Sequence, residues 1–319
     1  MAPVGMALGR RWREPAAAGT RGGATPQGDR MTGWRARRGL LPAAGSGAAA
    51  RHATIEMTQQ RGEDLLPMPV MPGAEPYSHD GSSTGVLLCH GFTGSPHSLR
   101  AWAEYLADAG LSVSLPRLPG HGTTWQEMAR TRWEDWYAEV NRAYNELRGQ
   151  ADQIFVMGLS MGGCLALRLA EAQGAAISGL VLVNPSVTAD TRLFALAPVL
   201  KLFVPSLKGI ASDIKKEGVT ELGYDRIPVR AAATLPGLWR STKDRLSDIT
   251  QPVLVYHSTE DHVVGAASLD VLRRALPPDQ LTVQNCDNSF HVATLDNDAQ
   301  AIFTGSLEFV RAHTHAGKE

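Results

Sequence analysis

The chain is organised around the pentapeptide Gly158-Leu159-Ser160-Met161-Gly162. The apolar run Ile154-Phe155-Val156-Met157 before it predicts a short buried strand, and residues 164–170 after it predict a helix packed through small side chains. A serine at such a sharp strand-to-helix turn has a strained backbone and an exposed hydroxyl. A Cβ two positions before or after the serine would collide with the neighbouring strand or helix, which explains both glycines. The pattern predicts a nucleophilic Ser160, and the alternative is an ordinary surface serine in a glycine-rich turn.

A nucleophilic serine needs a general base, and serines of this strand-turn-helix type carry their acid and then their histidine further along the chain. The histidines downstream of the serine are His257, His262, His291, His313 and His315. Two of these lie near the C-terminus, one ends an apolar run, and one follows an aspartate from which it would point away. His291 lies in Asn288-Ser289-Phe290-His291-Val292, a polar loop after a predicted strand, where an imidazole has room to turn. We therefore predict His291 as the base, against an ordinary loop histidine.

The acid is expected in the loop after the preceding strand. The run Val253-Leu254-Val255-Tyr256 predicts that strand, and Glu260 and Asp261 both follow it. The shorter side chain of Asp261 and the following Val263-Val264, which would anchor the loop, favour Asp261. The alternative for either carboxylate is a solvated turn position. An acid here would fix the imidazole tautomer and stabilise the imidazolium without taking the proton.

A second glycine-containing loop follows the first strong strand of the chain. Val86-Leu87-Leu88-Cys89 is apolar, and His90-Gly91-Phe92-Thr93-Gly94-Ser95-Pro96 comes directly after it. The backbone N–H of Phe92 is expected to pair with that of Met161 as an oxyanion hole. Loss of one such donor costs about 3–4 kcal/mol in transition-state stabilisation.

Several stretches together resemble the α/β-hydrolase superfamily and, within it, the bacterial carboxylesterase and monoacylglycerol lipase family. They cover about residues 80 to 312 and are His90-Gly91-Phe92-Thr93-Gly94-Ser95-Pro96, Leu118-Pro119-Gly120-His121-Gly122-Thr123, Trp133-Glu134-Asp135-Trp136, Gly158-Leu159-Ser160-Met161-Gly162-Gly163, Glu260-Asp261-His262-Val263-Val264 and Ser289-Phe290-His291-Val292-Ala293-Thr294-Leu295-Asp296. On that resemblance the catalytic triad is Ser160, Asp261 and His291, which selects Asp261 over Glu260. The resemblance implies hydrolysis of carboxylic esters, with monoacylglycerols preferred in some members.

Apolar strands and amphipathic helices alternate after residue 80. Strands are predicted near residues 85–89, 111–115, 153–157, 179–183, 252–256 and 281–285, and helices near 97–109, 131–149, 161–173, 266–275 and 298–312. This alternation predicts an α/β-hydrolase fold with a doubly wound, mostly parallel sheet and the site at the carboxyl ends of its strands. We expect residues 61–319 to form this domain.

The interval from Pro185 to Ile249 is too long for a simple crossover, and we expect a helical cap inserted at about residues 186–249. Its first part is apolar nearly all round, so it is either a helix pair buried against the domain or a lid over an acyl chain. Leu196 and Phe203 are candidate substrate-binding residues there. By position in the resembled family, Glu221 would hydrogen-bond the alcohol end of a glyceryl substrate, and the alternative is a solvated glutamate at a helix end.

The first 60 residues differ from the rest of the chain. They contain nine arginines and three acidic residues, which gives a net charge of +6 and leaves −7 on the remainder. Their low hydrophobicity predicts a disordered basic extension. Arg37-Arg38 permits a twin-arginine export signal, but the apolar stretch that follows is short, so we expect a cytoplasmic protein. Another interpretation of the segment is an over-extended start, with translation beginning at Met31 or Met57. The arginines are scattered without aromatic neighbours, so no nucleic-acid partner is expected.

The remaining features also bear on function. The sequence has no zinc-ligand spacing, Walker motif or dinucleotide fingerprint, so neither a metal nor a cofactor is expected. Its three cysteines, Cys89, Cys164 and Cys286, fall on predicted buried elements and indicate reduced core thiols. The expected partner is a small-molecule acyl ester, with transient lipid-surface contact through the cap. A thioesterase, lactonase or carbon–carbon hydrolase, or a non-enzymatic ligand receptor, would share the same motifs.

Overall fold

A computed structural model describes residues 68–189, 202–209 and 212–314 of the chain. Its contacts divide the chain into two units, Met1–Leu65 and Leu66–Glu319, and every described residue belongs to the second unit. The predicted basic extension of residues 1–60 lies outside the described residues. Leu196 and most of the apolar first part of the predicted cap also lie outside them.

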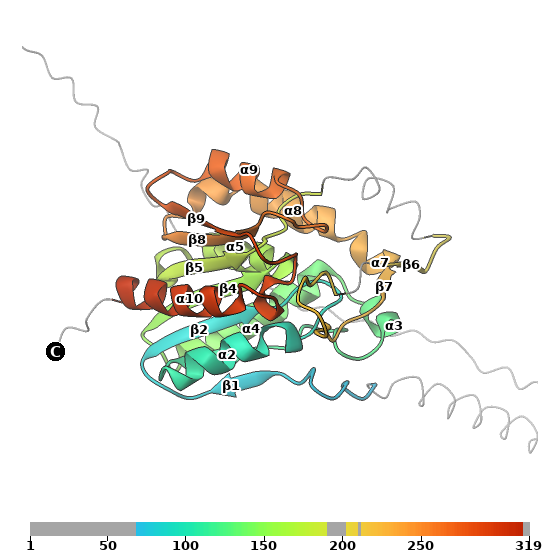
Figure 1. Cartoon of the computed structure of the whole chain (residues 1–319), viewed down its shortest axis with the longest axis horizontal. Helices are drawn as coiled ribbons and strands as arrows, with labels where there is room; N and C mark the ends of the chain where they lie inside the picture. The colour runs from blue at the N-terminus through green and yellow to red at the C-terminus, as the bar shows by residue number, and fades with distance from the viewer. Residues whose placement is uncertain (1–67, 190–201, 210–211, 315–319) are drawn as a thin grey trace, which may run out of the picture. The chain divides into compact units, whose positions relative to one another are not determined.

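A seven-stranded sheet forms the centre of the second unit (Figure 1). Its strands are β1 (Tyr77–His79), β2 (Thr84–Cys89), β3 (Ser112–Leu115), β4 (Gln153–Leu159), β5 (Gly179–Val183), β8 (Val253–Ser258) and β9 (Leu281–Cys286). The strand order is β1-β3-β2-β4-β5-β8-β9, and all neighbours are parallel except β1, which runs antiparallel to β3. The mostly parallel α/β sheet predicted from the sequence is confirmed.

Helices cover both faces of this sheet. The principal ones are α2 (His97–Asp108), α4 (Trp133–Arg148), α5 (Met161–Gln173), α8 (Leu235–Lys243), α9 (Ala267–Ala275) and α10 (Ala299–His313). Helices α2 and α10 share one apolar core with Val86 and Leu88, while α4, α5, α8 and α9 share the other with Leu87 and Cys89. Alternate side chains of β2 thus enter opposite layers, as strand geometry requires. None of the helices within the described ranges is long and apolar enough to cross a membrane.

The chain between β5 and β8 contains the segment predicted as a cap. Its described elements are β6 (Ser206–Lys208), β7 (Arg226–Pro228), α7 (Val229–Ala232), α8 and a 3₁₀ turn, η2 (Leu246–Asp248). Strands β6 and β7 pair antiparallel as a separate two-stranded sheet. Helix α8 returns to the main core, where Thr242 accepts a hydrogen bond from the thiol of Cys164 on α5 at 3.5 Å. We call residues 186–249 the cap segment.

The remaining described elements are short. They are α3 (Trp125–Met128) and the 3₁₀ turns η1 (Gly174–Ala176) and η3 (Ala293–Leu295). All three cysteines are free and buried, and burial raises the pKa of each thiol to about 12. At neutral pH the thiols are therefore protonated core groups.

Candidate active site

Ser160 lies in the sharp turn that joins β4 to α5. Its backbone has φ +56° and ψ −120°, a conformation that non-glycine residues rarely adopt. Two glycines make the turn possible: a Cβ on Gly158 would meet the carbonyl oxygen of Gly162, and one on Gly162 would meet the carbonyl of Cys89. The neighbouring strand fixes the turn through a 3.0 Å hydrogen bond from Ser160 N to the carbonyl of Val183. The serine is therefore held at the carboxyl end of β4 by close packing on both sides.

Asp261 and His291 come from the loops that follow β8 and β9, and their side chains meet. His291 Nδ1 lies 2.8 Å from Asp261 Oδ2, and the two side chains are 8% and 2% exposed. The other carboxylate oxygen, Oδ1, accepts hydrogen bonds from the backbone N–H groups of Val263 and Val264, each at 2.8 Å. Glu260, the competing carboxylate, instead pairs with Lys215 Nζ at 2.9 Å. Of the two acids, only Asp261 contacts the imidazole.

The ionisation of Asp261 decides which nitrogen of His291 carries a proton. Burial raises the pKa of Asp261, but the hydrogen bond and charge of His291 and the N–H groups of Val263 and Val264 outweigh it. The net pKa is below that of an ordinary aspartate, so the carboxylate is ionised at neutral pH. An ionised Asp261 accepts from Nδ1–H and leaves Nε2 as the basic atom. Nε2 has no hydrogen-bond partner among the described residues.

The main chain that follows β5 is hydrogen-bonded both to the serine and, through the Asn184 side chain, to the histidine. Ser186 N donates to the carbonyl of Ser160 at 3.0 Å, and Asn184 Nδ2 donates to the carbonyl of His291 at 2.8 Å. In the described part of the chain no hydrogen bond joins Ser160 Oγ to the His291 ring. The structure thus brings Asp261 and His291 into contact, and the serine–histidine contact stays a prediction. Such contacts often tighten only once substrate binds.

The loop after β2 lies against the serine. The Cβ position of Gly91 is 3.5 Å from the Cβ of Ser160. Burial lowers the pKa of His90 to about 4, so its ring is neutral, and Nε2 accepts from Leu118 N at 3.1 Å while Nδ1 donates to the Gly91 carbonyl at 3.0 Å. Neither the N–H of Phe92 nor that of Met161 donates a hydrogen bond to any described residue. Gly91, which precedes Phe92, lies against Ser160, and Met161 follows the serine directly. Both donors are free to bind an oxyanion, and the oxyanion hole stays a prediction.

Glu221 lies against the same loop from the cap segment. Ser98 Oγ donates to Glu221 Oε1 at 2.6 Å, and Glu221 N donates to Ser212 Oγ at 2.8 Å. Burial raises the pKa of the Glu221 carboxyl, against the Ser98 hydrogen bond and the charge of nearby His291. The residue lies in no helix and its carboxyl is partly enclosed, so the alternative of a solvated helix-end glutamate is wrong.

The cap segment packs so closely on this loop that Gly94 and Gly223 have no room for a side chain. A Cβ on Gly94 would lie 2.6 Å from Glu221 Oε1, and one on Gly223 would lie 2.8 Å from the carbonyl oxygen of Thr93. Tyr224 N also donates to the carbonyl of Thr93 at 2.9 Å. Residues 221–224 therefore pack main chain to main chain on the loop that carries Phe92.

Phe203 is the other predicted substrate-binding residue that the structure describes. Phe203 is 79% exposed, and its neighbour Leu202 is 71% exposed. This exposure fits a surface contact better than the wall of a closed acyl pocket. Nothing can be placed for Leu196, which falls outside the described residues.

Sequence reasoning missed Asn184, which directly follows β5. It is 1% exposed and has a φ of +43°. Its amide Nδ2 donates to the His291 carbonyl at 2.8 Å and to Ser258 Oγ at 2.9 Å, and its Oδ1 accepts from Ser258 N at 2.8 Å. The available signal was an asparagine at the carboxyl end of a buried strand, between Val183 and Pro185.

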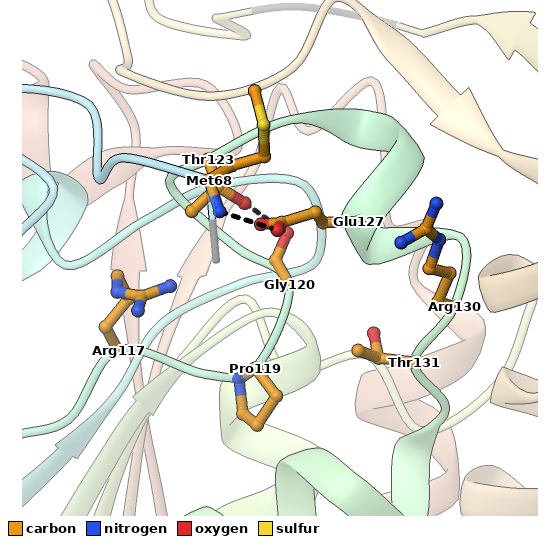
Figure 2. Close-up of a pocket in the computed structure, with 8 residues that line it drawn as sticks. All are labelled: Met68, Arg117, Pro119, Gly120, Thr123, Glu127, Arg130 and Thr131. Atoms are coloured by element: carbon orange, nitrogen blue, oxygen red, sulfur yellow. Dashed lines mark hydrogen bonds between the residues drawn. The ribbon is translucent and has the colours of Figure 1, made fainter. Parts of the chain in front are cut away.

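A cavity of about 300 Å³ lies elsewhere on the unit, and Figure 2 shows the residues that line it. Its lining residues are Met68, Arg117, Pro119, Gly120, Thr123, Glu127, Arg130 and Thr131. Glu127 Oε1 closes one side by accepting a hydrogen bond from Met68 N at 3.0 Å. The cavity is lined by none of the predicted site residues, so it does not serve as the acyl pocket of Ser160. No group of three metal-ligating side chains occurs in the described ranges.

The sequence is similar to those of known bacterial hydrolases. The sequence profile described as serine aminopeptidase, S33, a hydrolase family, matches residues 82–298. A thermostable monoacylglycerol lipase from Bacillus sp. (strain H-257) is 42% identical over 246 residues, which cover 77% of this chain and 97% of the relative. A carboxylesterase from Bacillus subtilis (strain 168) is 25% identical over 239 residues, covering 74% and 96%.

Solved structures agree with these relatives. A chain from the work on LipS and LipT, two metagenome-derived lipolytic enzymes, matches with a TM-score of 0.75 and 40% identity, covering 77% of this chain and all of the other. The monoacylglycerol lipase of Paleococcus ferrophilus has a TM-score of 0.64 at 21% identity, covering 75% of this chain and all of the other, and supports the fold alone. The chain therefore belongs to the S33 family of the α/β-hydrolase superfamily, in the group of bacterial monoacylglycerol lipases and carboxylesterases.

Proposed function

We propose that this protein hydrolyses carboxylic esters through Ser160, His291 and Asp261, with monoacylglycerols as preferred substrates. The observation that carries the proposal is the buried 2.8 Å contact between Asp261 and His291 at the sheet edge where Ser160 is held in its strained turn. The 42% identity to a thermostable monoacylglycerol lipase supports the substrate class.

Acylation uses the unoccupied ring nitrogen. His291 Nε2 takes the hydroxyl proton of Ser160 while Oγ attacks the ester carbonyl carbon. The N–H groups of Phe92 and Met161, which have no other described acceptor, hold the resulting oxyanion. Asp261 stays ionised and stabilises the imidazolium. The tetrahedral intermediate collapses when His291 protonates the leaving alcohol, which leaves the acyl group on Ser160.

Deacylation repeats these roles with water as the nucleophile. His291 Nε2 removes a proton from water, the hydroxide attacks the acyl carbonyl, and the oxyanion forms again at Phe92 and Met161. Collapse returns the proton to Ser160 Oγ and releases a carboxylic acid. Each cycle therefore consumes one ester and one water and needs no cofactor.

Glu221 supports a glyceryl ester as the substrate. Its carboxyl is partly enclosed beside the loop that carries Phe92, and only one oxygen is engaged by Ser98. A carboxylate in that position accepts hydrogen bonds from the hydroxyls of a glycerol leaving group. Thioester, lactone or carbon–carbon hydrolysis would use the same Ser160 but would leave Glu221 without a ligand.

We also propose that Leu202 and Phe203 contact the surface of aggregated substrate. Both side chains project into solvent at 71% and 79% exposure, and they adjoin the strand β6 of the cap segment. Adjacent exposed apolar side chains of this size are typical of interaction surfaces. Monoacylglycerols with long chains form aggregates in water, so an enzyme acting on them gains from such a contact.

The decisive test is Ser160→Ala, assayed on p-nitrophenyl esters and on monoacylglycerols. We expect kcat to fall by about 10⁴-fold or more, with the melting temperature preserved, because the attacking oxygen is removed. Ser178→Ala is the matched control, since that serine precedes β5 at the opposite end of the sheet. Turnover by Ser160→Ala near the wild-type rate would show that the proposed function is wrong. Covalent labelling at Ser160 by an organophosphate gives a second, independent readout.

A further inference from the structure

The stretch of residues 212–216 in the cap segment is bound to loops that belong to the core. The carbonyl of Asp213 accepts a hydrogen bond from Val292 N at 3.0 Å. The backbone N–H groups of Lys215 and Lys216 donate to the carboxylate of Asp296 at 2.6 and 2.9 Å. Asp296 is 2% exposed and also accepts from Phe290 N at 2.9 Å. This stretch and the loop of His291 therefore form one hydrogen-bonded assembly.

The side chain of Asp213 joins the two loops that carry the acid and the base. Its Oδ2 accepts from the backbone N–H of His291 at 3.1 Å and from that of His262 at 3.2 Å. Its Oδ1 lies 2.8 Å from His262 Nδ1. The Asp213 side chain is 9% exposed, whereas the side chain of His262 is 55% exposed, so the bond to the His291 main chain is the more buried one. One carboxylate thus holds the backbone of His291 and the residue that directly follows Asp261.

We infer that Asp213 is a positioning residue, which sets the distance between the loops of Asp261 and His291 so that their side chains meet at 2.8 Å. The inference rests on the proposed function, in which that contact orients the base. The two loops follow β8 and β9, which are paired up to their carboxyl ends, and Asp213 adds a contact between the loops beyond those ends. An ionised acceptor suits this role because charge-assisted hydrogen bonds are about twice as strong as neutral ones.

The geometry also says which step suffers when Asp213 is removed. Asp213 accepts from the backbone N–H of His291, and no predicted substrate-binding residue is among its recorded hydrogen-bond partners. Its loss therefore changes the alignment of His291 more than the binding of an ester. A misplacement of about 1 Å costs roughly a hundredfold in rate. For Asp213→Ala we expect kcat to fall about a hundredfold with KM changed less than threefold.

Replacing Asp213 by asparagine separates its contacts with backbone N–H groups from its contact with the His262 ring. In Asp213→Asn the amide oxygen still accepts from the two backbone N–H groups, while its NH₂ group faces the His262 ring. We expect kcat to fall about tenfold or less in this variant. Glu217→Ala is the matched control, because Glu217 directly follows the stretch of residues 212–216, is exposed and forms no ion pair within the described ranges. Its kcat and KM should equal those of the wild type.

The experiment that tests the inference is a double-mutant cycle with Asp261→Ala, measured on a p-nitrophenyl ester well below every melting temperature. If Asp213 acts by aligning the Asp261–His291 pair, its removal should cost less than threefold in kcat once Asp261 is absent. A loss of about a hundredfold in both backgrounds, or a loss no larger than that of Glu217→Ala, would overturn the inference.

Two further outcomes keep the result unambiguous. Should Asp213→Ala fail to fold, the same cycle is run with Asp213→Asn. The expected tenfold loss in kcat should then disappear when Asp261 is also replaced by alanine. Persistence of that loss in the Asp261→Ala background would overturn the inference. Turnover by Ser160→Ala would contradict the proposed function itself. Inactive Ser160→Ala together with Asp213 variants that match the Glu217 control would contradict only the positioning role.

Discussion

Hydrogen bonds hold both the main chain and the side chain of His291 in place. Its backbone N–H donates to Asp213, its carbonyl accepts from Asn184, and its ring contacts Asp261. The preceding carbonyl, that of Phe290, accepts from Ser258 Oγ at 2.8 Å. A histidine on a loop would otherwise sample many orientations, because loops have few local hydrogen bonds. These contacts explain how an irregular segment can carry a precisely oriented base.

At the same scale, Glu221→Gln tests the proposed glyceryl ester. The amide keeps the shape but loses the charge that strengthens hydrogen bonds from glycerol hydroxyls. We expect kcat/KM for a monoacylglycerol to fall about tenfold relative to the methyl ester of the same acid, the equivalent of roughly 1.4 kcal/mol. An unchanged ratio between the two substrates would remove this role and leave a general carboxylesterase.

The free energy of unfolding of Glu221→Gln, measured against pH, is the control for this specificity measurement. Burial raises the pKa of Glu221 in the folded protein above about 4.3, the value of an unfolded glutamate. The unfolded chain therefore releases this proton at lower pH, and folding becomes less favourable as pH rises through that window. The glutamine has no such proton, so its free energy of unfolding should gain on the wild type as the pH rises above about 4.3. A specificity loss from general destabilisation would instead appear in denaturant titrations as a lower free energy of unfolding at every pH.

At the scale of elements, the junction of β4 and α5 depends on how closely α5 approaches β2. The register pairs Cys89 with Gly158, and α5 begins at Met161 directly beside the end of β2. The Cβ position of Gly162 coincides with the carbonyl of Cys89. This tight backbone contact places the N-terminus of the helix beside the serine, where its N–H groups can stabilise an oxyanion.

Gly162→Ala should therefore separate α5 from β2. We expect a loss of more than about 3 kcal/mol in the free energy of unfolding, or no soluble protein, because main chain must move to admit the methyl group. Gly149→Ala is the matched control, since Gly149 has a helical backbone (φ −71°, ψ −13°) and its added Cβ would meet only the Glu146 carbonyl at 3.2 Å. Equal urea denaturation midpoints for the two variants would contradict the described packing.

All six predicted strands appear within about two residues of their predicted bounds. Four of them, near residues 85–89, 153–157, 179–183 and 252–256, are nearly continuous apolar runs, which is the pattern of a sheet buried on both faces, whereas 111–115 and 281–285 alternate apolar and polar residues. Strands β1, β6 and β7 were not predicted, since three residues carry too little periodicity. Within the site, Ser160, Asp261 and His291 could be proposed from motifs on strand ends. Asn184 and Asp213 could not, because their roles come from partners 49 or more residues away.

At the scale of the whole unit, polar groups gather where the parallel strands end. Ser160 follows β4, Asn184 follows β5, Asp261 follows β8 and His291 follows β9, so four successive strands of the sheet each contribute one group. Parallel strands place all these ends on one edge, and this is why the site lies there. The cap segment adds Asp213 and Glu221 to the same edge from an insertion rather than from a strand.

The exposed pair on the cap segment makes a prediction about the unit as a whole. Replacing both Leu202 and Phe203 by serine should weaken binding to phosphatidylcholine vesicles that contain monoacylglycerol by roughly 100- to 10⁴-fold, since burial of each side chain contributes about 1.5–3 kcal/mol. Hydrolysis of soluble p-nitrophenyl acetate should not change. Met68→Ser is the control, because Met68 is 46% exposed but lies beside the cavity of Figure 2. Equal vesicle binding by all three proteins would contradict surface contact through this pair.

The hydrogen bonds that Asp213 and Asp296 accept have a consequence for protein engineering. Exchanging the insertion after β5 for that of a relative is a natural way to alter specificity, since a lid is commonly treated as a detachable cover. Here the exchanged piece would take with it the acceptor for the main chain of His291. A chimera that omits a carboxylate at this position should bind its new ester and turn it over slowly, and grafts should be designed with residues 212–216 retained from the host.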